Sequence, residues 1–162
     1  MDSGAHFSCC RRFRYALWRE WDASLPAVML IGLNPSTADA RRDDPTIRRC
    51  IRFAGSWGFG RLWMVNLFAF RATYPKDLMA AADPVGPRND WWLRRTGRRA
   101  DRVVAGWGND GARFGRSYRV RELFGDRLEI IRLNATGQPA HPLYLPAGLE
   151  PVTWGLQKSG ET

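Results

Sequence analysis

The feature that most constrains the fold is a series of short apolar runs, each followed by a loop rich in polar residues, glycine or proline. Short apolar runs bounded in this way are typical of buried β-strands. Ala27–Gly32 is the clearest example, and the others are Leu62–Leu67, Val103–Ala105 and Leu128–Leu133. We expect these runs to form the core of a sheet, with the weakly alternating segment Phe13–Trp18 as an edge strand.

Helical patterns lie between these runs. Residues 46–55 carry apolar side chains at helical spacing, and Pro45 stands where proline favours the first helical turn. Residues 87–100 have the pattern of a basic helix. Strands that alternate with helices favour a parallel sheet covered on both faces. We therefore predict an α/β protein with three layers, α/β/α, around a four-stranded, mainly parallel sheet.

Length and composition suit one domain. The chain has 162 residues, of which 44% are hydrophobic, enough for one sizeable core. We divide it into an N-terminal edge strand and arm (1–25), a core (26–146) and a C-terminal tail (147–162). No apolar run is long enough to span a bilayer, and the N-terminus lacks the apolar segment of a signal peptide. We expect a cytoplasmic monomer that does not bind membranes.

The cysteines indicate a reducing compartment. Cys9, Cys10 and Cys50 are too few for a disulfide framework, and we expect the first two to lie in a frayed N-terminus. No cysteine and histidine pair has the spacing of a zinc site, and three thiols fall short of the usual set for an iron–sulfur cluster. We predict no metal and no cofactor.

The charge indicates an acidic polymer as partner. Lysine and arginine number 25 against 16 acidic residues, which gives a net charge of +9. Such an excess is typical of nucleic-acid-binding proteins. A solubilising, arginine-rich surface is the alternative, so charge alone favours DNA only slightly.

Polar residues follow each of the four expected core strands. They are Gly32–Ser36, Asn66, Gly108–Asp110 and His141–Leu145. Ligands of open α/β sheets bind beyond the carboxyl ends of the strands, so we expect these segments to converge on one cleft. For any one segment the alternative is an ordinary turn, since Asn, Gly and Pro are common turn residues.

A family resemblance appears at these residues. Gly32–Ser36 resembles the first motif of the uracil-DNA glycosylase superfamily, and its asparagine makes it most similar to the mismatch-specific branch. His141–Leu145 is similar to the final His-Pro-Ser-x-Leu loop of these enzymes, while Val104–Gly108 resembles their penultimate strand and turn. The sequences GLNPSTAD and HPLYL also resemble a bacterial family of unknown function. The resemblance covers roughly residues 26 to 146.

The resemblance implies roles that suit the chemistry of N-glycosidic bond cleavage. This reaction builds positive charge on the sugar and negative charge on the departing base. Asn34 would orient the attacking water, and His141 would donate a hydrogen bond to the base or to a phosphate. Asn66 would bind the edge of an extruded base, since its carboxamide is both donor and acceptor. Each of the three could instead hold a strand end through ordinary hydrogen bonds.

The expected base pocket also includes Leu33 and Ser36. Ser36 stands where the strictly uracil-specific branch has a tyrosine that obstructs the C5 position, so its small side chain favours a larger, C5-modified pyrimidine. For the aromatic ring that stacks on the base we choose Phe68, with Trp57 and Phe59 as alternatives. All three could be core residues.

Two further residues, Asp44 and Leu145, each have a possible functional role and a possible structural one. A carboxylate of Asp39, Asp43 or Asp44, of which we choose Asp44, could act as the base in place of Asn34. Asp43 and Asp44 could instead favour the N-terminus of the following helix. Leu145 stands where the resembled loop has the apolar wedge that fills the space of a flipped base, and its alternative is ordinary packing. For phosphate contacts we choose arginines near the strand ends: Arg41, Arg42, Arg113 and Arg116.

The sequence thus predicts a monofunctional DNA glycosylase that removes a C5-modified pyrimidine, in DNA repair or in defence against bacteriophages with modified cytosine. The lysines, Lys76 and Lys158, lie outside the motifs, which argues against a lyase step through a Schiff base. Two alternatives remain open. The same cleft could hydrolyse free nucleosides or nucleotides, or the protein could bind nucleic acid without chemistry.

Overall fold

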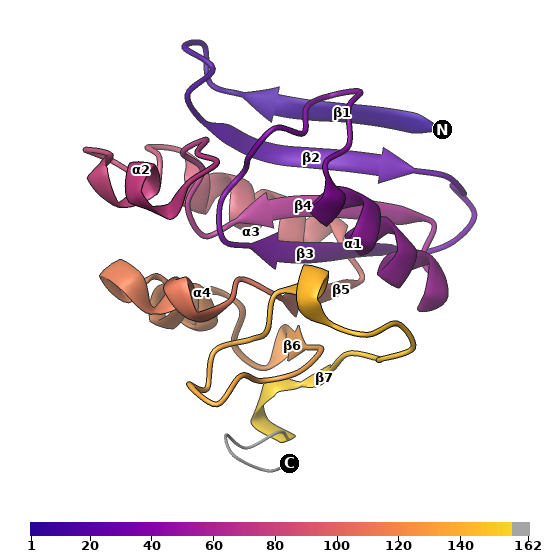
Figure 1. Cartoon of the computed structure of the whole chain (residues 1–162). Helices are drawn as coiled ribbons and strands as arrows, with labels where there is room; N and C mark the ends of the chain where they lie inside the picture. The colour runs from indigo at the N-terminus through magenta and orange to yellow at the C-terminus, as the bar shows by residue number, and fades with distance from the viewer. Residues whose placement is uncertain (157–162) are drawn as a thin grey trace.

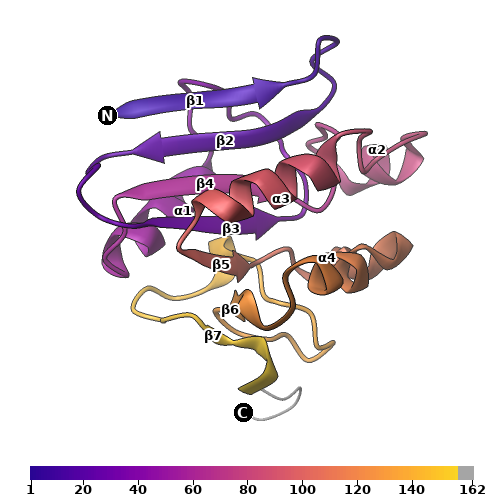
Figure 2. The same ribbon diagram turned by 180° about the vertical axis from the view of Figure 1, so that it is seen from behind.

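The computed structural model describes residues 1–156 and places a single twisted sheet between helices (Figures 1 and 2). Within these residues the sheet has seven strands in the order β1-β2-β4-β3-β5-β6-β7. Their bounds are β1 Asp2–Phe7, β2 Arg14–Glu20, β3 Ala27–Gly32, β4 Arg61–Asn66, β5 Arg102–Ala105, β6 Leu128–Ile130 and β7 Val152–Thr153.

The pairing of the strands differs from the prediction. β4, β3, β5 and β6 are adjacent and pair in parallel, whereas the pairings of β1 with β2, β2 with β4 and β6 with β7 are antiparallel. The α/β class is confirmed, but a four-stranded, mainly parallel sheet is not. The segment expected as an edge strand is an inner one, because the N-terminus forms β1 outside it rather than a frayed arm. Cys9 and Cys10 lie in the turn between β1 and β2.

Helices cover both faces of the sheet. α1 (Pro45–Ser56) packs on one face, while α3 (Asn89–Arg99) and α4 (Arg116–Phe124) lie on the other, and α2 (Pro75–Ala80) stands at one end (Figures 1 and 2). The apolar residues of β3 divide between the faces. Val28 and Leu30 pack with the α1 side, and Met29 and Ile31 pack with the α3 side. A strand with both faces covered must be apolar throughout, which explains the unbroken run.

One irregularity at the start of β2 affects the site. His6 of β1 pairs with Ala16, but Phe7 pairs with Arg14, so Tyr15 is an extra residue in the ladder. An extra residue of this kind is a β-bulge, and it changes the face to which the preceding side chain points. Arg14 therefore shares the α1 face with Leu17, although regular alternation would place it on the other side.

The rest of the chain adds little to the site. Among residues 1–156 no helix could cross a bilayer, and no cluster of His, Cys, Asp and Glu could hold a metal ion. The end of the predicted tail, including Lys158, lies outside the described residues. Residues 147–156 run along the β6 edge and add the short strand β7.

Candidate functional site

A cavity of about 50 Å³ lies beyond the carboxyl ends of β3 and β4. Its polar lining comes from separate parts of the chain: Arg14, Asn34, Ser36, Asp44, Thr46, Asn66 and His141. A buried water needs roughly 10–15 Å³ of such space, so the cavity has room for several waters. The structure thus brings together the segments that the sequence placed after three different strands.

The strand order of the sheet reverses beside the cavity. From β3 the chain passes to β4 on one side and then crosses to β5 on the other, so the strand order reverses between β3 and β5. Crevices form at such switch points because the loops on the two sides diverge. Two glycines allow close approach here. A Cβ on Gly32 would lie 2.9 Å from Asn66 Oδ1, and a Cβ on Gly106 would lie 2.9 Å from the Pro142 ring.

The Asn34 carboxamide is held in one orientation. Its Nδ2 donates to the Ala72 carbonyl at 2.7 Å and to the Pro35 carbonyl at 3.1 Å. Both donor hydrogens are thereby engaged, which identifies the other atom as Oδ1, a hydrogen-bond acceptor. Within the described chain no side chain or backbone group donates to this oxygen. It is available to accept a hydrogen bond from a water or a ligand in the cavity.

Asn66 presents a donor at the end of β4. The side chain is 2% exposed, and its Nδ2 has no hydrogen-bond partner within residues 1–156. The free energy of an unpaired buried amide is high, by about 1–3 kcal/mol, so such a group is normally satisfied by a ligand or water. Asn89 fixes the backbone here, because its Nδ2 donates to the Asn66 and Leu67 carbonyls at 2.9 Å.

His141 begins the turn η3 (Pro142–Tyr144) and is held as a neutral imidazole. Its Nδ1 accepts a hydrogen bond from the Leu143 backbone N–H at 3.2 Å. Burial lowers the pKa of His141 below 6.5, and the nearby Asp44 carboxylate opposes this effect. A neutral ring whose Nδ1 accepts must carry its proton on Nε2. His141 is therefore a neutral N–H donor at the cavity.

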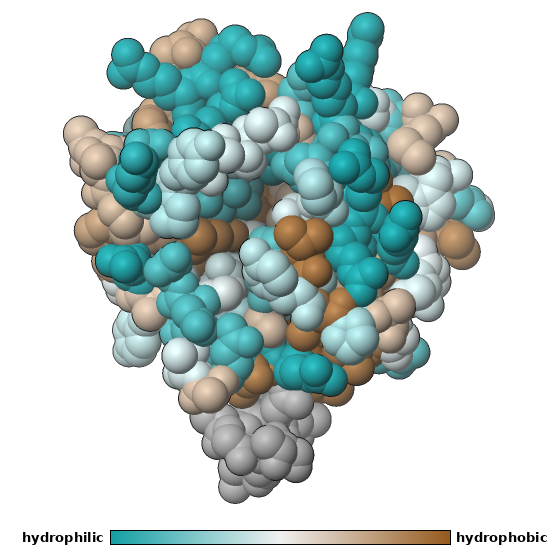
Figure 3. Space-filling view, viewed as in Figure 1, coloured by the Kyte–Doolittle hydropathy of each residue, from teal (hydrophilic) through white to brown (hydrophobic). Residues whose placement is uncertain are grey.

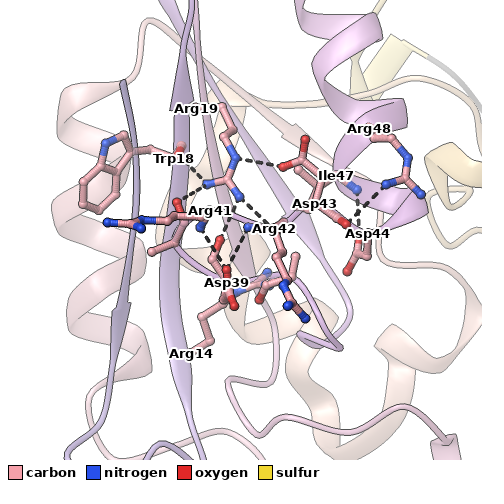
Figure 4. Close-up of polar contacts among 12 residues, drawn as sticks. Arg14, Trp18, Arg19, Asp39, Arg41, Arg42, Asp43, Asp44, Ile47 and Arg48 are labelled. Carbon is pink, nitrogen blue, oxygen red and sulfur yellow. Dashed lines mark hydrogen bonds and ion pairs between the residues drawn. The ribbon is translucent and has the colours of Figure 1, made fainter. Parts of the chain in front are cut away.

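Asp44 serves the helix as well as the cavity. Its Oδ1 accepts from the Ile47 backbone N–H at 2.8 Å, which makes it the N-cap of α1 (Figure 4). The capping role that was the alternative for this residue is thus present. Oδ2 has no hydrogen bond among the described residues, so the second oxygen is free to face the cavity.

Arg14 is the cavity residue that sequence reasoning missed. It is 2% exposed, and its only side-chain hydrogen bond within the described chain runs from Nη1 to the Ala38 carbonyl at 3.1 Å. Nε has no partner there, and no carboxylate lies within ion-pair distance. Because β2 runs antiparallel to β4, the first residue of β2 lies at the edge where β4 ends. The bulge at Tyr15 then directs it to the α1 face.

A second buried arginine supports the loop that carries the site. Arg19 donates to Asp43 at 2.8 Å and to the carbonyls of Trp18, Asp39, Ala40 and Arg42 (Figure 4). Asp39 Oδ1 in turn accepts from the backbone N–H groups of Arg41 and Arg42. These contacts hold the segment between Asn34 and Asp44 against β2.

The structure corrects two of the predicted site residues. Phe68 is completely buried in the core and contacts Phe114, away from the cavity, and Trp57 and Phe59 do not line it either. Leu145 is 7% exposed and packs under α1, because the single turn of η3 carries it back toward the sheet. It cannot protrude as a wedge.

Two other residues, Leu143 and Tyr144, have exposed apolar side chains near the cavity. Leu143 and Tyr144 of η3 are 39% and 82% exposed, and the Tyr144 ring lies 5.6 Å from the His141 ring. Figure 3 shows a mostly hydrophilic face with hydrophobic atoms near its centre, over the region where this turn lies in Figure 1. A three-residue turn that leaves Leu143 outside and Leu145 inside was not readable from the motif alone.

The four arginines that were predicted to contact DNA differ in exposure and in hydrogen-bond partners. The prediction that Arg116 contacts DNA is wrong, because this side chain is 5% exposed and donates to Asp90 at 2.8 Å and to the Leu67 carbonyl at 3.0 Å. Arg113 is exposed, and it pairs with Asp110 at 3.1 Å. Arg41 and Arg42 line an open groove with Arg11, next to the loop that carries Asp44. Of the four, this pair has the position that suits a phosphate backbone.

Comparison with known proteins gives one match. A family model described as "Protein of unknown function (DUF1643)" covers residues 14–143, which include every polar residue of the cavity lining. No curated protein and no solved structure matches the chain.

Proposed function

We propose that this chain, which belongs to the DUF1643 family of proteins of unknown function, is a DNA glycosylase that hydrolyses the N-glycosidic bond of a C5-modified pyrimidine. The observation that carries the proposal is the set of free groups in one small cavity. Asn34 offers an acceptor, Asn66 and His141 offer donors, and Asp44 offers a carboxylate oxygen. These are the groups that cleavage of a base from a sugar requires.

An extruded pyrimidine would present its polar edge to the cavity, which at about 50 Å³ is smaller than the ring and would have to widen or leave part of the ring outside. Asn66 would hydrogen-bond its polar edge, using the Nδ2 that is otherwise unpaired. Leu33 and Ser36 would lie on the C5 side, where Ser36 Oγ has only a long contact of 3.5 Å to Thr73 Oγ1. A small hydroxyl that is weakly held leaves room for a substituent and can bind a polar one. The small Ser36 side chain therefore favours a base such as hydroxymethylcytosine or its glucosylated form over uracil.

The reaction would be a dissociative hydrolysis. The bond between the sugar C1′ and the ring nitrogen breaks, and its electron pair stays with the base. His141 donates a hydrogen bond from Nε2 to the departing ring without giving up its proton. Water held by Asn34 Oδ1 adds its oxygen to C1′, and its proton passes to the free oxygen of Asp44. An amide is a poor base, so Asn34 orients the water while Asp44 takes the proton.

The surroundings suit a DNA substrate rather than a free nucleoside. The net charge of +9 favours a polyanion, and Arg41 and Arg42 lie beside the loop that ends at Asp44. The exposed Leu143 and Tyr144, rather than the buried Leu145, would enter the duplex and fill the space left by the flipped base. The similarity of Gly32–Ser36 and of the His141 loop to uracil-DNA glycosylase motifs supports the same chemistry.

The test is base release from duplexes that differ in one base. Duplexes with uracil, hydroxymethylcytosine and glucosylated hydroxymethylcytosine are incubated with the protein, and abasic sites are detected by alkaline cleavage. We expect cleavage of at least one modified duplex, loss of activity in Asn34→Ala and full activity in Arg98→Ala, which removes an exposed side chain of α3 outside the cavity. Release from free nucleosides alone would contradict the proposal, and salt-dependent DNA binding without release would replace it with a binding role.

A further inference from the structure

Arg14 is a buried cation without a counter-ion in the described structure. Its guanidinium lines the cavity at 2% exposure, Nε is unpaired, and one carbonyl accepts from Nη1. Burial lowers the pKa of Arg14 to about 10, and the negative charge of Asp44 opposes this shift. The side chain remains protonated at neutral pH.

Such an arrangement is costly in free energy. A buried charge without a partner loses its hydration and gains nothing in return, so buried arginines normally make several hydrogen bonds or ion pairs. Arg19, on the same strand, follows that rule with five hydrogen bonds. The bulge at Tyr15 directs Arg14 to the cavity rather than away from it. A costly side chain held at a cavity by an irregularity of the strand indicates a ligand.

We propose that Arg14 is the anion-binding group of this cavity and that it stabilises the negative charge of the departing base. The inference rests on the proposed glycosylase function and assigns it one more catalytic residue. When the C1′–N bond breaks, the electron pair remains on the ring, and the base is an anion until it is protonated on release. A guanidinium in a water-poor cavity lowers the energy of that anion more than one in water would.

The division of charge in the cavity fits this role. Asp44 and Arg14 interact electrostatically but form no ion pair, so neither neutralises the other fully. The carboxylate is free to receive the proton of water on the sugar side, and the guanidinium is free to face the base. His141, being neutral, supplies a directed hydrogen bond but no net charge. Arg14 is thus the cationic side chain of the cavity lining.

The direct test is the affinity for free pyrimidines that differ in charge. At neutral pH 5-nitrouracil is an anion and thymine is neutral, and both carry a C5 substituent. By calorimetric titration we expect wild-type protein to prefer 5-nitrouracil by about tenfold or more. Arg14→Gln should lose this preference, and Arg14→Lys should keep part of it. Arg98→Gln, which removes an exposed charge on α3, should keep all of it. Equal affinities in wild type, or a preference that survives Arg14→Gln, would overturn the inference.

A second test uses the reaction itself. In duplexes with 5-hydroxymethyluracil or 5-formyluracil, both bases carry a C5 substituent, and the electron-withdrawing formyl group stabilises the departing anion, so 5-formyluracil depends less on Arg14. Arg14→Gln should slow single-turnover release of 5-hydroxymethyluracil by about 100-fold and that of 5-formyluracil much less. Equal losses would exclude a role in stabilising the leaving base. If no duplex releases any base, the proposed function fails and the catalytic role fails with it, while the titrations still decide whether Arg14 binds anions.

Discussion

Arg14 and Arg19 lie on the same strand, at 2% and 1% exposure, and their surroundings are opposite. Arg19 lies in a cluster that satisfies its guanidinium with Asp43 and four backbone carbonyls (Figure 4). Arg14 lies at the cavity with one carbonyl as partner and Nε unpaired. The strand therefore carries one arginine whose guanidinium is satisfied by the loop and one whose guanidinium is largely unpaired at the cavity.

Buried polar groups in this fold thus differ in how completely they are hydrogen-bonded. Buried polar atoms are satisfied almost everywhere in native proteins, and exceptions concentrate at sites of function. Among the described residues six buried side-chain atoms are such exceptions, and two of them, Asn66 Nδ2 and Arg14 Nε, line the same cavity. Variants of the cavity should therefore change activity, and variants of the Arg19 cluster should change stability.

The largest expected effect is on the cavity side. Asn34→Ala removes the oriented acceptor for water and should lower base release by about 1,000-fold. Stability should fall by only about 1 kcal/mol, because two hydrogen bonds to the Ala72 and Pro35 carbonyls are lost at a partly exposed site. Single-turnover kinetics and urea unfolding measure the two quantities. Unchanged base release would contradict this role and would indicate that Asp44 alone orients the attacking water.

The next largest effect is expected on stability, in the cluster around Arg19. Arg19→Met leaves Asp43 and four carbonyls without their donor, and should lower the free energy of unfolding by about 3–5 kcal/mol. Urea unfolding of this variant is compared with that of Arg98→Met, an exposed arginine whose replacement should change stability by less than about 0.5 kcal/mol. A loss no larger than that of the control would mean that the cluster does not hold the loop.

Arg14→Met should change the free energy of unfolding in the opposite direction to Arg19→Met. Replacing a buried charge that has no counter-ion by an apolar side chain removes its desolvation cost, so stability should rise by about 1 kcal/mol. The same unfolding experiment measures it. A loss as large as that of Arg19→Met would show that Arg14 is structural and would remove the contrast between the two arginines.

The smallest effect concerns pH. Burial lowers the pKa of His141 below 6.5, so the unfolded chain binds a proton at a higher pH than the native chain does. The stabilisation is complete above pH 6.5 and is lost as the pH falls through the lowered value. His141→Gln should flatten this decrease in urea unfolding at mildly acidic pH, whereas His6→Gln should leave the His141 contribution in place. Imidazole titration by NMR should show a further lowering in Asp44→Asn, because the carboxylate raises this pKa. An ordinary His141 pKa would contradict the neutral donor.

Much of the fold could be predicted from the sequence, because buried parallel strands are continuous apolar runs. The run Ala27–Gly32 became β3 with the same bounds, and the helix expected at 46–55 is α1. The antiparallel strands β1 and β7 were missed, since a short strand at a sheet edge has no apolar run to reveal it.

The site was predictable where it depended on strand ends and not where it depended on packing. Asn34, Asn66 and His141 meet because parallel strands end at one edge. Arg14 was missed, because a bulge leaves no mark in the sequence, although an arginine before apolar Tyr15–Leu17 is a weak signal. Arg116 was misplaced because its partners, Asp90 and the Leu67 carbonyl, are remote in sequence.

The measurement that tests the central claim most directly is the fate of the water oxygen. A duplex that carries glucosylated hydroxymethylcytosine is incubated with the protein in water enriched in heavy oxygen, and the products are weighed by mass spectrometry. Cleavage of the N-glycosidic bond predicts an intact, unlabelled base and an abasic strand, with both products absent in Asn34→Ala; the C1′ oxygen of the abasic sugar exchanges with water, so the label in the base is the diagnostic one. Label in the base, or an unchanged duplex across the modified pyrimidines, would contradict the claim that this cavity cleaves the N-glycosidic bond.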